Sequence, residues 1–312
     1  MKEVSKVIGI GLALVDERIY VSQTKEAGEP IDSNPGGVTP NVLYAFAHTI
    51  PGYPTRLIAR IGNDSRGKEY LKKHGGGFSH LQIDEEKNTG YCIYTIDPRN
   101  KTVLEVKTSY GAARNLRISQ EELNDLRDCL FITDVYTLSL PSLHPSLQEI
   151  TQRVTNEGGI LALNLAGTNM LDDEDTIINL LGYKPDIVFG NKQEVAPFIR
   201  KRGIFCTFPH AEVLVETLGS KGSVIRYSGE LIYCPPYKVN CEDIVNEIGV
   251  GDCFMGVMLA SLFVKKGIWA KEHILKVAEI ASYAASVLLT QKNQSRLDRD
   301  TMLLIQDMVA KL

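Results

Sequence analysis

The chain has 312 residues, a formal net charge of −4 and a hydrophobic fraction of 44%. These values fit one large α/β domain or two modest ones. The mild negative charge argues against a nucleic-acid partner, and the sequence has no lysine- and arginine-rich run that would bind a phosphate backbone.

The 6 cysteines stand singly, without a CxxC pair or a matching histidine cluster. This pattern favours reduced thiols in a cytoplasmic protein over disulfides or a zinc site. The first apolar run, residues 7–15, is too interrupted for a secretory leader and too short to span a bilayer, so we expect no membrane partner. We interpret it as the first core strand.

Strand-like and helix-like segments then alternate. A helix is expected to begin over residues 41–48, a strand to run over 55–61, and a helix to run over 65–74 and end at a group of glycines. Such alternation predicts a parallel sheet with helices on its faces.

Residues 89–106 follow a different pattern, because apolar and polar side chains alternate there on either side of the turn Asp97-Pro98-Arg99-Asn100. This predicts a hairpin. With the segments near residues 20–22 and 28–33, the hairpin is expected to form a small sheet outside the main one.

The α/β alternation resumes after residue 115. Strands are expected near residues 130–133, 159–165, 187–190, 213–217 and 223–227, and helices over 254–264 and 272–289. Since no linker or repeat divides the chain, we expect a single domain over residues 1–312.

The segment Gly249-Val250-Gly251-Asp252 comes directly before a long apolar helix. Glycines let the backbone turn tightly, and the amides of a helix's first turn favour an anion such as phosphate. A carboxylate is unexpected beside a phosphate unless it accepts the proton of a hydroxyl that attacks the phosphorus. Asp252 would alternatively cap the helix; the residues alone leave both interpretations open.

Gly249-Val250-Gly251-Asp252 resembles the GAGD motif of the ribokinase-like (PfkB) carbohydrate and nucleoside kinases. Other motifs of that family follow the same order: NPGGVTPN at residues 34–41, RIGNDSRG at 60–67, NKQE at 191–194 and TLGSKGS at 217–223. The segments GLALVD at 11–16 and YGAA at 110–113 resemble sequences of the adenosine-kinase-like branch of this family.

The resemblance implies an α/β protein with a three-layer α/β/α fold, a mostly parallel central sheet and a small β-sheet lid built from about residues 17–35 and 88–112. It also implies an activity, in which the γ-phosphoryl group of ATP moves to a primary hydroxyl of a sugar or ribonucleoside. Asp252 would be the base, and the amides of Gly249, Val250 and Gly251 would form the anion hole.

The resemblance also assigns binding residues. Asp16, Gly36, Gly37 and Asn41 would bind hydroxyls of the acceptor, although Asp16 at a strand end would alternatively be a turn acid.

On the nucleotide side, Asn191 and Glu194 would lie near Mg²⁺, with Glu194 acting through water. Thr217, Gly219 and Gly222 would line the phosphates and ribose of ATP. The alternatives are a helix N-cap with a first-turn acid for the Asn191–Glu194 pair and a plain β-turn for the glycines.

Asn246 and Glu247 stand where the family usually has Asp and Thr, which puts the monovalent cation (K⁺) site in doubt. They motivate an alternative function, a catalytically impaired regulatory protein of the same fold that binds a sugar or nucleoside. The acceptor stays open, because Tyr20, Tyr91, Tyr94 and Tyr110 would suit either a purine or ordinary sheet packing. A monomer and a lid-mediated homodimer both fit a small sheet with exposed edges.

Overall fold

The computed structural model describes residues 4–20, 32–74, 79–97, 103–167, 182–202, 208–245, 247–264, 270–291 and 296–312, with positions 175 and 179. Some predictions lie outside the described residues. These are the lid segment at 21–31, the glycine helix stop at 75–77, the hairpin turn at 98–100, and Asn246.

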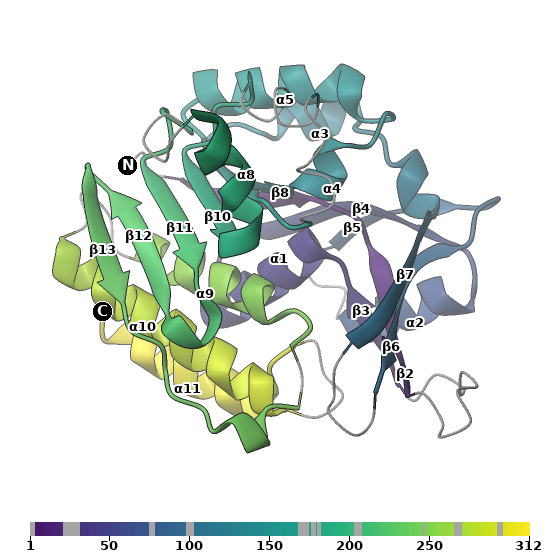
Figure 1. Ribbon diagram of the computed structural model, residues 1–312. Coiled ribbons are helices and arrows are strands. Elements are labelled where there is room, and N and C mark those ends of the chain that lie inside the picture. The colour runs from purple at the N-terminus through teal and green to yellow at the C-terminus, as the bar shows by residue number, and fades with distance from the viewer. Residues whose placement is uncertain are drawn as a thin grey trace.

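A nine-stranded sheet forms the centre of the molecule, in the order β13-β12-β11-β10-β9-β8-β1-β4-β5 (Figure 1). Neighbours pair in parallel from β11 to β5, whereas β12 and β13 are antiparallel. The strands are β1 (Lys6–Ile10), β4 (Thr55–Gly62), β5 (Ser79–Asp84), β8 (Cys129–Asp134), β9 (Ile160–Asn164), β10 (Ile187–Asn191), β11 (Val213–Thr217), β12 (Ser223–Tyr227) and β13 (Glu230–Cys234). This confirms the predicted mostly parallel central sheet.

Helices cover both faces of this sheet and make three layers (Figure 1). One face carries α1 (Val38–Thr49), α9 (Val250–Val264), α10 (Lys271–Thr290) and α11 (Arg299–Ala310), and the other carries α3 (Gln120–Asn124), α4 (Val135–Leu138), α5 (His144–Asn156) and α8 (Lys192–Arg202). Successive strand residues alternate between the two cores, because side chains of a strand point to opposite faces. Val7 packs on the first core and Ile8 on the second.

The length and apolar composition of α10 would also fit a membrane span. This is weak support for one, since 56% of the stretch is buried in the fold. The helix packs against α9 and α11, as a core helix does.

A separate four-stranded sheet lies beside the large one, in the order β3-β2-β6-β7. Its strands are β2 (Leu14–Tyr20), β3 (Asp32–Gly36), β6 (Thr89–Ile96) and β7 (Val103–Gly111), and α2 (Ser65–His74) packs nearby against β3. The predicted hairpin is β6 and β7, which pair antiparallel. Val103, Leu104 and Val106 are exposed on β7, which pairs only with β6 in the described part of the chain; the oligomeric state stays a prediction.

The prediction of one strand over residues 7–15 is wrong. β1 ends at Ile10 and β2 begins at Leu14, so the apolar run crosses from the large sheet to the small one. A Cβ at Gly11 would lie 2.5 Å from Cβ of Thr39, so a glycine lets the crossing pass close to α1. Leu12 and Ala13 are buried in the crossing, which is why hydrophobicity alone did not reveal the break.

Candidate active site

Four polar side chains mark the carboxyl ends of adjacent strands in the large sheet. Asp134 ends β8 opposite Asn164 at the end of β9. Asn191 ends β10 opposite Thr217 at the end of β11. Strand order reverses at β1, which pairs with β4 on one side and β8 on the other. In open α/β sheets, ligands bind at this edge, near such a reversal.

The N-terminus of α9 reaches this edge. Gly249 has a φ of 75°, which favours glycine, and its carbonyl accepts the first helical bond, from Cys253 N at 2.9 Å. The amides of Val250 and Gly251 precede that bond, so the helix itself does not pair them. A Cβ at Gly251 would meet nothing within 4 Å, so there is open space beside the first turn. This end of the helix suits an anion.

Asp252 lies in the first turn of α9, and two amide side chains from other elements hold its carboxylate. Asn41 Nδ2, from α1, donates to Oδ2 at 3.2 Å. Asn164 Nδ2, from β9, donates to Oδ1 at 3.4 Å. Because α9 begins at Val250, the cap position belongs to Gly249, and Asp252 is not the N-cap of this helix.

The surroundings of Asp252 raise the pKa of its carboxyl to about 8. Desolvation is the main cause, the hydrogen bond from Asn41 opposes it, and the nearby acids Asp134, Asp16 and Glu194 add to it. The residue is nevertheless only half-buried. A carboxyl group with a pKa near neutrality is suited to accept a proton from a bound hydroxyl.

The predicted acceptor residues lie close together: Gly36 packs against Asp16, and the backbone amide of Asn41 donates to the carbonyl of Gly37 at 3.0 Å. Asp16 lies within β2 rather than in a turn, and burial raises the pKa of its carboxyl to about 7. A Cβ at Gly36 would overlap this carboxyl group. Gly37 has a φ of 99°, and a Cβ there would overlap the carbonyl oxygen of Leu12. Asn41 lies one turn into α1, so the acceptor group is contiguous with Asp252.

Asn191 and Glu194 form a reciprocal cap at the start of α8. Asn191 Oδ1 accepts from the amide of Glu194 at 3.0 Å, and Glu194 Oε2 accepts from the amide of Asn191 at 2.8 Å. The second Glu194 oxygen accepts from Gly167 N at 3.4 Å. Burial raises the pKa of Glu194. The helix cap that we gave as the alternative is therefore observed, and a role of Asn191 and Glu194 near magnesium stays a prediction.

The segment after β11 is a tight turn. Leu218 N donates to the carbonyl of Gly222 at 2.7 Å around the short 3-10 helix Gly219–Lys221. Gly222, with a φ of 83°, packs where a Cβ would overlap the carbonyl oxygen of Cys234. A Cβ at Gly219 would meet nothing within 4 Å, which leaves open space beside the turn. The turn alternative is thus present, and nucleotide binding by Thr217, Gly219 and Gly222 stays a prediction.

Three residues of this region were not predicted: Asp134, Asn164 and Arg296. The buried carboxylate of Asp134 caps α4 through Thr137 N at 2.9 Å and accepts from Thr39 Oγ1 of α1 at 2.5 Å. A polar residue that ends an apolar strand was the available signal for Asp134 and Asn164. Nothing local in the sequence points to Arg296.

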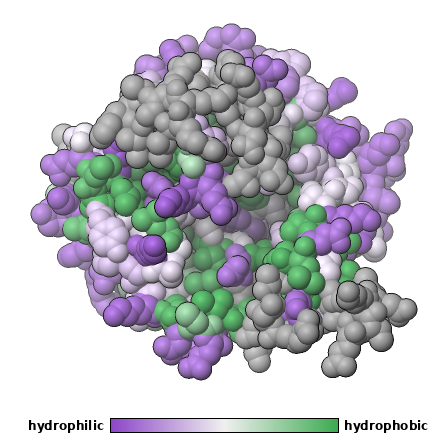
Figure 2. Space-filling view, viewed as in Figure 1, coloured by the Kyte–Doolittle hydropathy of each residue, from purple (hydrophilic) through white to green (hydrophobic). Residues whose placement is uncertain are grey.

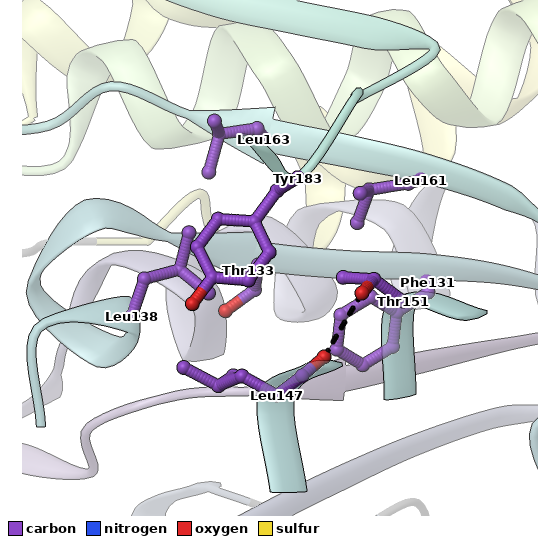
Figure 3. A pocket seen from close by; sticks show the side chains of 8 residues that line it. All are labelled: Phe131, Thr133, Leu138, Leu147, Thr151, Leu161, Leu163 and Tyr183. Atoms are coloured by element: carbon purple, nitrogen blue, oxygen red, sulfur yellow. Dashed lines mark hydrogen bonds between the residues drawn. The ribbon is translucent and has the colours of Figure 1, made fainter. Parts of the chain in front are cut away.

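Two depressions in the described part of the chain are lined by residues other than the predicted site residues. An apolar pocket lies between α5 and strands β8 and β9, where Tyr183 and Thr133 face Leu138 (Figure 3). A second depression lies at the amino ends of β1 and β4, near the Lys6–Asp125–Arg56 ion pairs. On the face seen in Figure 2, hydrophilic and hydrophobic patches alternate.

The fold and site together define a class: a ribokinase-like α/β/α protein that places a carboxylate in the first turn of a helix at the carboxyl edge of the sheet. A family model described as pfkB family carbohydrate kinase matches residues 4–301. The chain therefore belongs to the pfkB family of carbohydrate kinases, and it is a sugar or nucleoside kinase.

Relatives agree in fold and length. Adenosine kinase from Schizosaccharomyces pombe is 22% identical over 278 residues, covering 78% of this chain and 80% of that protein. The adenosine kinase structure from Sinorhizobium meliloti has a TM-score of 0.82 at 15% identity, covering 97% of this chain and 99% of that one. Ribokinase from Arabidopsis thaliana, complexed with ribose and ATP, has a TM-score of 0.71 at 18% identity, with coverage of 97% and 99%.

Proposed function

We propose that this protein transfers the γ-phosphoryl group of ATP to a primary hydroxyl of a sugar or ribonucleoside, with Asp252 as the general base. The observation that carries the proposal is the Asp252 carboxylate, which lies at the N-terminus of α9 between donors from α1 and β9. A base and an anion site side by side are what phosphoryl transfer to an alcohol needs.

The acceptor binds between the small sheet and α1. Asp16 supplies a buried carboxyl group, and hydroxyl groups of a polyol would supply the hydrogen bonds that such a group needs. Burial raises the pKa of Tyr94 of β6, and the nearby carboxyl groups of Asp16 and Asp252 add to the rise. A tyrosine of the small sheet near both acids supports a small sheet that covers the acceptor as a lid. The hydroxyl nearest Asp252 gives its proton to that carboxylate as its oxygen attacks the γ-phosphorus, and the bond between this phosphorus and the bridging oxygen breaks to release ADP.

The amides of Gly249, Val250 and Gly251 receive the charge of the transferred group. They are fixed before the reaction by the burial of α9 from Cys253 to Leu262, so little reorganisation is needed.

The nucleotide and its metal fit the adjoining strand ends. The Glu194 carboxylate acts electrostatically on Asp252, so a cation beside it would lie near the transferred group. No cluster of three or more His, Cys, Asp or Glu side chains suited to a metal occurs among the residues that the structure describes. This is compatible with Mg²⁺, which keeps several of its waters and, when bound, neutralises phosphate charge. Open space beside Gly219 supports a nucleotide there.

The test is a panel of adenosine, other ribonucleosides, ribose, fructose and related sugars with Mg-ATP, with ADP release and phosphorylated product both measured. Potassium is varied in parallel. We expect product from at least one acceptor, phosphorylated at its primary hydroxyl. If no acceptor of the panel yields ADP or phosphorylated product although an acceptor still binds, the result would favour the regulatory alternative.

A further inference from the structure

The two amide side chains on Asp252 are arranged alike. The Oδ1 atom of Asn164 accepts from the backbone amide of Ala166 at 3.1 Å, and Oδ1 of Asn41 accepts from Arg296 Nε at 3.5 Å. A carboxamide has its acceptor oxygen and its donor nitrogen on opposite sides, so fixing the oxygen also fixes the NH₂ group. Both NH₂ groups are therefore directed at the carboxylate of Asp252.

Arg296 is itself held by groups other than carboxylates. Its guanidinium lies 4.3 Å from the centroid of the Tyr44 ring, and Nη2 donates to His74 Nδ1 at 2.8 Å. His74 is buried and stacks on Tyr70, and burial together with Arg296 lowers its pKa to about 2, so its ring is neutral and accepts. In the described part of the chain, Arg296 forms no ion pair, and its Nη1 atom has no hydrogen-bond partner.

We propose that Arg296 is a positioning residue for phosphoryl transfer, which holds the Asn41 carboxamide so that its NH₂ group donates to the base Asp252. This inference rests on the proposed function, in which Asp252 is the base. Without Arg296, the Asn41 amide is free to turn and bring its oxygen toward the carboxylate. That orientation repels the charged form of Asp252 and makes the base harder to ionise.

Other charged and titratable groups surround both side chains. The pKa of Asp252 is raised by the neighbouring acids Asp134, Asp16 and Glu194. Asp252 in turn adds to the rise in the pKa of Tyr94, which burial mainly causes. Around Arg296 the charged and titratable groups are Tyr44, Tyr70, His74, His48 and Asp16. Removing the arginine also removes a positive charge from this region, so the experiment must separate its charge from its hold on Asn41.

A double-mutant cycle makes this separation. The pKa of Asp252 is followed by ¹³C NMR of labelled aspartate side chains in the wild type, Arg296→Met, Asn41→Leu and the double variant, with the signal assigned through Asp252→Asn. We expect Arg296→Met and Asn41→Leu each to raise this pKa by about one pH unit. In the double variant, we expect no further rise beyond that of Asn41→Leu.

The proposal is overturned if the pKa of Asp252 is higher in the double variant than in Asn41→Leu alone, because the arginine would then act on Asp252 directly through its charge. An unchanged pKa in Arg296→Met would also overturn it. If that variant does not fold by thermal melting, Arg296→Lys replaces it, since lysine keeps the charge but lacks the guanidinium fork. A raised pKa in Arg296→Lys supports the proposal, and a wild-type pKa contradicts it.

Enzyme kinetics give a second measurement, which depends on the proposed function as well as on the role of Arg296. In Arg296→Met, we expect kcat to fall roughly tenfold and the acid limb of the pH–kcat profile to move to higher pH, because the base is protonated over a wider range. Arg153→Met, at a surface pair with Glu149, is the control and should leave the limb in place. If the wild type shows no turnover, the proposed function fails, while the NMR cycle still decides the role of Arg296.

Discussion

Two carboxyl groups with pKa values near neutrality lie in one site, and they differ in what contacts them. Asp16 packs under Gly36 with 5% of its surface exposed, whereas the half-buried Asp252 receives donors from Asn41 and Asn164. The two environments suit two roles, one side chain that grips the acceptor and one that takes its proton.

The pKa of Asp252 predicts a pH dependence. Burial raises it to about 8, and a general base works only when deprotonated, so kcat/KM should rise with pH through about 8 and fall on the acid side. A pH–rate profile from pH 6 to 9.5 measures this. A flat profile over that interval would contradict the assignment of Asp252 as the base.

Gly36 is predicted to control acceptor binding. In Gly36→Ala the new methyl group overlaps the carboxyl of Asp16 and displaces it, so we expect KM for the acceptor to rise about tenfold or more, with KM for ATP nearly unchanged. Gly182→Ala is the matched control, because a Cβ there meets nothing within 4 Å. Equal effects on both Michaelis constants would indicate general distortion instead.

At this scale the sequence predicted residues with a strong local pattern. Gly249 to Asp252 were predicted as site residues because two glycines and an acid precede an apolar helix. Arg296 was missed because its partners Tyr44, His74 and Asn41 are distant in the chain and only the fold brings them together.

At the scale of the elements, Asp134 joins two helices to one strand end. Its carboxylate caps α4 and binds both the amide and the hydroxyl of Thr39 in the first turn of α1, the helix that carries Asn41. The position of Asn41 therefore depends on the end of β8.

Replacing this carboxylate should destabilise the fold. We expect Asp134→Ala to lower the free energy of unfolding by about 2–4 kcal/mol, because it removes a cap and leaves buried donors unpaired. Urea unfolding measures the loss. Asp298→Ala is the control, since Asp298 caps α11 through Thr301 N at 2.8 Å in an exposed position and should cost only about 1 kcal/mol. Equal losses in the two variants would contradict the joining role of Asp134.

Elements with a clear hydrophobic periodicity were predictable from sequence. The point at which the chain passes from the large sheet to the small one was not. The helix at residues 65–74 and the strands at 213–217 and 223–227 were predicted with their observed bounds. The break between β1 and β2 was missed because both sheets bury the apolar residues on either side of it.

At the scale of the whole molecule, an ion pair ties the small sheet to the rest of the fold. Arg66 of α2 donates to Glu17 of β2 through Nε at 2.7 Å and Nη2 at 3.1 Å, and its guanidinium lies 4.8 Å from the Tyr91 ring centroid on β6. Glu17 is only 5% exposed, and a buried carboxylate that loses its ion-pair partner is strongly destabilising.

Loss of this ion pair should loosen the small sheet selectively. In Arg66→Met, we expect amide hydrogen exchange in β2 and β6 to accelerate roughly tenfold or more, while β8 and β9 in the large sheet keep their protection. Hydrogen exchange with mass spectrometry reports both regions in one experiment. Uniform acceleration in the two sheets would show that the pair stabilises the whole fold.

The order of motifs along the chain was enough to predict the overall architecture, including the separate small sheet. It did not identify the acceptor or the oligomeric state. Both depend on side chains that the motifs do not contain, such as the tyrosines of the small sheet and the exposed edge of β7.

The most direct test of the account compares acceptor phosphorylation by the wild type and by Asp252→Asn, with acceptor binding measured by calorimetry on both. We expect kcat to fall by about 10²–10⁴ in the variant while the acceptor still binds, because the amide keeps the shape of the site but cannot take the proton. Turnover by Asp252→Asn at a rate close to that of the wild type would contradict the role given to Asp252.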